Sequence, residues 1–128
     1  MLGERSLGTR VVVADDVEDL RWLLCAVLSG DGRFDIVGEA ADGREAVDLV
    51  RLTRPDVVLL DLCMPRMDGL EAAAEIHEVV PETKIVVLSA VEERAVAAAT
   101  QRVGISAFIQ KGCSARQISE AVALVAAQ

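Results

Sequence analysis

The stretch Val57-Val58-Leu59-Leu60-Asp61 consists of four apolar residues followed directly by a carboxylate. Three further runs end on a reactive polar residue in the same way: residues 11–14 before Asp15 and Asp16, residues 85–88 before Ser89, and residues 107–110 before Lys111. Short runs rich in valine, isoleucine and leucine are typical of strands buried on both faces, as in a parallel sheet. Because parallel strands end at the same edge of a sheet, the sequence predicts that three carboxylates, a hydroxyl and an ammonium gather there.

The segments around these runs predict the remaining elements. A run at residues 34–38, shorter and more polar than the others, is expected to be a further strand at a sheet edge. Helices are expected to begin near Leu20, Asp42, Asp68, Glu92 and Ser114, since apolar residues follow each at helical spacing. The first helix is expected to bury Leu20, Leu23, Leu24, Val27 and Leu28 and to end at Gly30-Asp31-Gly32.

Strands and helices alternate five times, which predicts an α/β fold with a doubly wound parallel sheet and helices on both faces. No Gly-x-Gly-x-x-Gly fingerprint is present. The flavodoxin-like (βα)5 strand order 2-1-3-4-5 is therefore favoured. In that order the first and third strands are neighbours, so Asp16 and Asp61 are expected to face each other where ligands bind.

Composition limits the classes of protein that fit. The 128 residues suit a single domain over residues 1–128, with residues 1–9 as a flexible N-terminal segment, and 52% hydrophobic residues argue against disorder. No apolar stretch approaches the roughly 20 residues that span a bilayer, and no signal-peptide core is present, so a cytoplasmic location is expected. A net charge of −8 disfavours direct binding of nucleic acid.

The cysteines do not suggest a metal cluster or a disulfide framework. Cys25, Cys63 and Cys113 are odd in number and far apart, and His77 is the single histidine. Zinc sites need closely spaced cysteine and histidine ligands. Reduced structural thiols are therefore expected.

The residues that follow the predicted strands resemble those of the receiver domain of two-component response regulators. The resemblance rests on the acidic pair Asp15-Asp16, Asp61, Ser89 and Lys111, and it runs from about Arg10 to Ala126. The stretch Asp61-Leu62-Cys63-Met64-Pro65-Arg66-Met67-Asp68-Gly69 is also similar to the family's loop after the phosphorylated aspartate. Residues 38–46 resemble the subfamily whose receivers precede a helix-turn-helix output domain.

This resemblance implies a phosphorylation-controlled switch. Asp61 would accept a phosphoryl group from a partner histidine kinase. Mg²⁺, a cation that prefers oxygen ligands, would be held by Asp16, Asp61 and the backbone carbonyl of Cys63. Asp15 would bind the ion mainly through water. The domain would catalyse only its own phosphotransfer and dephosphorylation, so it is not classed as an enzyme.

Three further residues have roles in the implied switch. Lys111 would pair with Asp61 before phosphorylation and with a phosphoryl oxygen afterwards. The Ser89 hydroxyl would move toward a second phosphoryl oxygen. Phe108 would rotate inward as Ser89 moves, although simple core filling is the alternative for this ring. The face formed by the fourth helix, the fifth strand and the fifth helix would change, and this change would control partner binding or dimerisation. A homodimer could form through this face or through the first and fifth helices, and the sequence leaves the oligomeric state open.

Two positions depart from the family pattern. Gly112 follows Lys111 where the family usually has proline, and a cis bond before glycine is costly, so a trans bond and a looser loop are expected. Cys63 and Val91 flank the site at positions that influence attack by water in the family. Neither side chain orients water well, which predicts slow autodephosphorylation.

Other functions remain open at this point. A receiver-like docking domain that is not phosphorylated fits the same fold. A phosphatase of the haloacid-dehalogenase type is disfavoured because Cys63 stands where that family has its second aspartate, and 2% aromatic residues disfavour a flavin-binding protein. The sequence fits both a free-standing receiver and part of a longer regulator with a DNA-binding output domain, and it does not identify the kinase.

Overall fold

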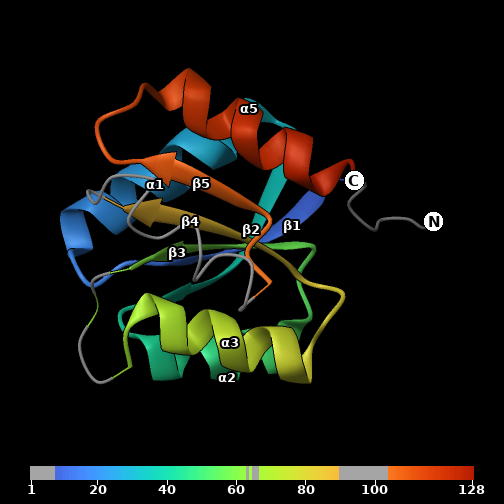
Figure 1. Cartoon of the computed structure of the whole chain (residues 1–128). Helices are drawn as coiled ribbons and strands as arrows, with labels where there is room; N and C mark the ends of the chain where they lie inside the picture. Colours follow the sequence, from blue (N-terminus) through green and yellow to red (C-terminus); the bar gives the residue numbers. More distant parts are fainter. Residues whose placement is uncertain (1–7, 63, 65–66, 90–103) are drawn as a thin grey trace.

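A computed structural model describes residues 8–62, 64, 67–89 and 104–128 of the chain. Within these residues, five parallel strands form one sheet in the order β2-β1-β3-β4-β5 (Figure 1). The strands are β1 (Thr9–Ala14), β2 (Phe34–Ala40), β3 (Val57–Asp61), β4 (Lys84–Ser89) and β5 (Ala107–Gln110). This order confirms the flavodoxin-like fold, in which β1 and β3 are neighbours.

Helices cover both faces of the sheet (Figure 1). The described residues form α1 (Glu18–Asp31), α2 (Gly43–Thr53), α3 (Gly69–Val79) and α5 (Ala115–Ala126). Helices α1 and α5 pack on one face, and α2 and α3 pack on the other. The helix expected from Glu92 to Val103 lies outside the described residues. None of the described helices is both long and apolar enough to cross a bilayer.

The central strands are buried on both faces, which explains their continuous apolar sequence. Val11, Val13 and Leu59 pack with α1 and α5, whereas Val12 and Leu60 pack with α2 and α3. Because successive side chains of a strand point to opposite faces, each residue of such a strand contributes to one core layer or the other.

The starts of three helices are fixed by the residues that the sequence predicts as caps. The Asp42 carboxylate accepts a hydrogen bond from the backbone N–H of Glu45 at the start of α2. Asp68 and Ser114 form reciprocal capping boxes at α3 and α5 with residues three positions later. Helix α1 differs, because Val17 at its start provides no side-chain cap. It ends at Gly32, whose φ of +82° is left-handed.

Two local expectations are wrong. Strand β2 occupies an edge as predicted, but its seven residues make it the longest described strand rather than a short one. Its pairing with β1 continues to Ala14 and Ala40 across an irregularity at Val11 and Val12, so backbone hydrogen bonding extends past the apolar run. Leu23 is 50% exposed, since Leu24 and Leu28 face the sheet and a neighbouring residue lies about 100° further round the helix.

Candidate functional site

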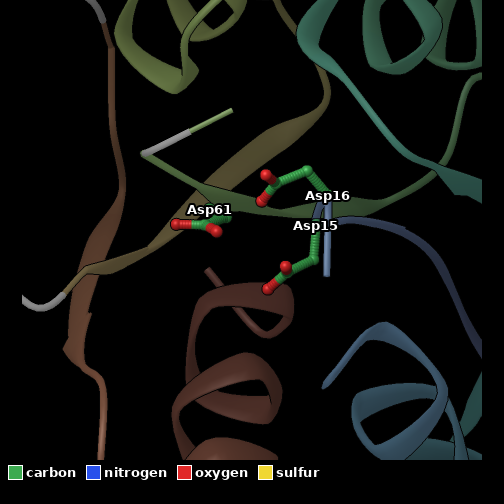
Figure 2. Close-up of side chains that lie close together, drawn as sticks. All are labelled: Asp15, Asp16 and Asp61. Carbon is green, nitrogen blue, oxygen red and sulfur yellow. The ribbon is translucent and has the colours of Figure 1, made fainter. Parts of the chain in front are cut away.

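Strands β1 and β3 bring three carboxylates together at their carboxyl ends. Ala14 pairs with Leu60, so Asp15 and Asp61 occupy corresponding positions at the ends of neighbouring strands. Each of Asp15, Asp16 and Asp61 offers an oxygen within 4.8 Å of the others. Figure 2 shows the three carboxyl groups around a common space. The structure therefore assembles the acidic cluster that the sequence predicts.

Asp15 is fully buried and incompletely compensated. Its Oδ1 accepts a hydrogen bond of 2.9 Å from the backbone N–H of Val17. Its Oδ2 is buried and has no hydrogen-bond donor among the described residues. Burial raises the pKa of Asp15, and the charges of Asp61 and Asp16 act in the same direction, whereas the Val17 hydrogen bond and Lys111 oppose them. A bound cation would give this oxygen the positively charged partner that it lacks among the described residues.

Lys111 pairs with Asp61 as the sequence predicts. The Lys111 Nζ lies 3.1 Å from Asp61 Oδ1, and the aspartate side chain is 2% exposed while the lysine side chain is 29% exposed. The backbone N–H of Lys111 donates to the carbonyl of Ser89, which fixes the lysine next to the end of β4. A buried carboxylate is thus held beside one partly accessible ammonium group.

A tight turn follows Lys111. The N–H of Cys113 donates to the carbonyl of Gln110 at 3.4 Å, and Gly112 has a φ of +100°. A positive φ at the third residue of a turn is the type II geometry, which glycine adopts without strain. The described residues contain no cis peptide bond, so the Lys111–Gly112 bond is trans as expected.

Ser89 lies on β4, the neighbour of β3, and Phe108 lies on β5, the edge strand beyond β4. Ser89 is buried at the end of β4, one residue after Leu88, which pairs with Asp61. Phe108 lies within β5, is half-buried, and packs against the core layer that contains Leu60. The positions suit a switch pair, but their movement remains a prediction.

The described residues on either side of the predicted phosphorylation loop, Asp61 and Met67, make close backbone contacts that the sequence did not predict. A Cβ atom added to Gly69 would lie 2.4 Å from the Asp61 carbonyl oxygen, and one added to Gly43 would lie 2.0 Å from the Met67 carbonyl oxygen. Such spacings exclude any side chain. Asp61 and Leu62 therefore pack closely against the start of α3, and Met67 against the start of α2. The predicted ligand carbonyl of Cys63 lies outside the described residues.

The two thiols that the structure describes lie on α1 and in the turn after β5. Cys25 and Cys113 are free and half-buried. Burial raises the pKa of Cys25 to about 11, and the charge of Glu39 adds to the shift. Their reduced, structural role stays a prediction.

Comparison with known proteins identifies the family to which this site belongs. The sequence matches the response regulator receiver domain over residues 11–123. The chain belongs to the response regulator receiver domains. The acidic cluster, Lys111 and Ser89 of this receiver thus lie at the strand ends expected from the family resemblance.

Relatives of two kinds resemble this receiver. The chemotaxis protein CheY of Thermotoga maritima is 34% identical over 116 residues, which cover 91% of this chain and 96% of CheY. The transcriptional regulatory protein PdtaR of Mycobacterium tuberculosis is 38% identical over 123 residues, which cover 94% of this chain and 58% of PdtaR. The receiver therefore spans nearly all of the first relative and just over half of the second.

Solved receiver domains have the same fold. The signal receiver domain of the response regulator NarL from Mycobacterium tuberculosis superposes with a TM-score of 0.89 at 36% identity, covering 94% of this chain and 97% of that one. CheY in the CheX-CheY-BeF3-Mg²⁺ complex from Borrelia burgdorferi gives 0.84 at 28% identity, covering 91% of this chain and 88% of that one.

Proposed function

We propose that this receiver is a phosphorylation-controlled switch in which Asp61 accepts a phosphoryl group from a histidine kinase. The observation that carries the proposal is the buried Asp61 carboxylate, with Lys111 Nζ at 3.1 Å and two further carboxylates within 4.8 Å. An oxygen of Asp61 attacks phosphorus while the bond from phosphorus to the donor breaks, and the donor leaves with that electron pair. Lys111 stays close enough to neutralise a phosphoryl oxygen.

The acidic cluster fits Mg²⁺. The buried Oδ2 of Asp15, which lacks a donor among the described residues, is a hard oxygen on one of the three clustered carboxylates. Asp15, Asp16 and Asp61 would hold the ion, with the Cys63 carbonyl as a further ligand. When bound, Mg²⁺ supplies positive charge that balances the phosphoryl oxygens. Without it, the three negative charges oppose one another.

The proposed output follows from the change of charge at Asp61. Ser89 would contact the phosphoryl group, and Phe108 would repack on β5, altering the face that β5 and α5 form with residues 92–103, which lie outside the described residues. A homodimer, through this face or through α1 and α5, or an output domain would read the change. The similarity to the transcriptional regulatory protein PdtaR favours a transcriptional output. By the family resemblance, that output would act through a DNA-binding domain in the cytoplasm.

Intact mass after incubation with acetyl phosphate and Mg²⁺ tests the proposal. The wild type should gain one phosphoryl group, and Asp61→Asn should gain none. Asp56→Asn is a matched control, because Asp56 precedes β3 at the opposite end of the same strand and is exposed. A gain of a phosphoryl group by Asp61→Asn would show that another residue is the acceptor. No gain in the wild type, with Mg²⁺ bound, would favour the docking domain that is not phosphorylated.

A further inference from the structure

Arg21, in the first turns of α1, connects the acidic loop to the edge strand of the sheet. Its Nη1 donates a hydrogen bond of 2.7 Å to the backbone carbonyl of Asp15. Its Nε lies 3.3 Å from Glu39 Oε1 on β2. The arginine side chain is only 17% exposed. One guanidinium group therefore joins α1, the loop after β1, and β2.

The carbonyl that Arg21 binds belongs to the peptide bond between Asp15 and Asp16. A peptide group is planar, so fixing its oxygen restricts the directions in which both neighbouring side chains leave the backbone. The carboxylate of Asp15 has a second restraint, the hydrogen bond from Val17. Asp16 is exposed, and the residue at the start of α1 provides no side-chain cap that would hold this loop. The bond from Arg21 thus restrains the segment from which Asp16 projects.

We propose that Arg21 is a positioning residue for the Mg²⁺ site: it orients the Asp15–Asp16 peptide so that the Asp16 carboxylate faces the space shared with Asp15 and Asp61. This inference rests on the proposed function of the acidic cluster. Arginine is required because two nitrogens of one planar group reach the carbonyl and Glu39 together. A lysine ammonium, a compact charge at the end of a flexible stem, does not reproduce that fork.

A positioning role and a purely electrostatic role predict opposite changes in Mg²⁺ affinity. The positive charge of Arg21 lies near the acidic loop and repels a cation. If charge were its whole effect, removing it would strengthen Mg²⁺ binding. If Arg21 orients the ligands, removing it weakens binding, because groups that hold metal ligands in place typically contribute about 10-fold or more to affinity.

Calorimetric titration of the metal-free chain with Mg²⁺ measures this difference. Arg21→Met and Arg21→Lys should each raise the dissociation constant about 10-fold. Arg33→Met is the matched control, since Arg33 also bridges two acidic residues, Asp31 and Glu120, but does so away from the cluster. It should leave the dissociation constant unchanged. Thermal unfolding without Mg²⁺ reports any loss of stability separately for each variant.

Each outcome bears on the proposal. Mg²⁺ binding by Arg21→Met that is as tight as in the wild type, or tighter, would overturn it, even if the melting temperature falls. Wild-type affinity in Arg21→Lys would overturn the need for the guanidinium fork. If Arg21→Met does not fold, Arg21→Lys carries the test. A wild type that binds no Mg²⁺ would instead overturn the metal site itself, which distinguishes failure of the proposed function from failure of this inference.

Discussion

The two ends of the parallel sheet differ in how their carboxylates are partnered. At the amino ends of the strands, Asp56 accepts a 2.8 Å hydrogen bond from the backbone of Arg10. There too, Arg33 contacts Asp31 through two nitrogens and reaches Glu120 at 3.0 Å. At the carboxyl ends, three carboxylates share a small space next to the Lys111 ammonium. Among the described residues, the carboxylates at the amino ends are hydrogen-bonded, whereas those at the carboxyl ends lie close to one another.

The shifts in pKa show the consequence of this difference. Hydrogen bonds from Arg33 lower the pKa of Asp31, while burial raises the pKa of Asp15. An arrangement that costs stability is retained where an ion and a phosphoryl group are proposed to bind, which is typical of functional sites. Variants made in pairs, one at each end of the sheet, test this difference.

The largest effect is expected for Lys111→Met. Phosphorylation by acetyl phosphate should slow by about 10²-fold, the usual loss when one donor to a developing anion is removed. The measurement is the rate of phosphoryl gain by intact mass. Lys84→Met, at the amino end of β4, should react at the wild-type rate. Equal rates for the two variants would show that the charge at the carboxyl end is not used for chemistry.

Mg²⁺ should stabilise the folded chain through the acidic cluster. At a Mg²⁺ concentration 100 times the dissociation constant, the free energy of unfolding in urea should rise by about 2.7 kcal/mol. Asp16→Asn should lose most of this gain because it removes the exposed ligand of the cluster. Asp48→Asn, an exposed acid on α2, should keep it. A gain of the same size in Asp16→Asn would place the ion elsewhere.

Removing one carboxylate at each end should change stability with opposite signs. Without Mg²⁺ at pH 7, Asp15→Asn should raise the free energy of unfolding by about 1 kcal/mol, since a buried and incompletely bonded charge is removed. Asp31→Asn should lower it, because Arg33 loses a charged partner. Urea unfolding across pH measures both changes.

The pH dependence of these two variants follows from their pKa shifts. A carboxyl with a raised pKa binds its proton more tightly in the folded state than in the unfolded state. Ionisation of Asp15 therefore lowers the free energy of unfolding as the pH rises from 3.8, the unfolded pKa, through the raised pKa of the folded state. The stabilisation of the folded state by Asp31 is complete above pH 3.8 and is lost as the pH falls through the lowered pKa of Asp31. A benefit of Asp15→Asn that stays constant down to the lowest pH would contradict this account.

The smallest effects are expected for two glycines. Gly112→Ala should destabilise the fold by about 1 kcal/mol, since a φ of +100° is unfavourable for a residue with a Cβ. Gly30→Ala, on the exposed face of α1 with no atom within 4 Å of the added methyl, should stabilise it by about 0.5–1 kcal/mol. Thermal unfolding of both variants checks the signs, and the same sign in both would refute the backbone argument.

Much of the sheet could be predicted because its signals are local. The buried runs and the polar residues after them are consecutive in the sequence, and the caps Asp42, Asp68 and Ser114 act over three residues. The placement of Asp15 and Asp61 then follows from strand order alone. Lys111 could likewise be singled out because it directly follows the last apolar run, whereas the tight turn at Gly112 was not predicted.

What could not be predicted depends on contacts between distant segments. Strand β2 looked short because its side chains are half-exposed, although its backbone pairs with β1 over its whole length. Arg21 and Glu39 are 18 residues apart and meet only after folding. Leu23 has the helical spacing of a core residue yet faces outward. Periodicity identifies a face of a helix, but not which residues at its margins are covered.

Gly69 limits which mutations the lineage of this chain can accept. Its Cα lies so close to the backbone of Asp61 and Leu62 that a Cβ would overlap the carbonyl oxygen of the proposed nucleophile. Every amino-acid change that one base substitution can make in a glycine codon adds at least that atom. A substitution at Gly69 would therefore displace the proposed acceptor Asp61 although Asp61 itself is unchanged. The position is therefore closed to gradual change.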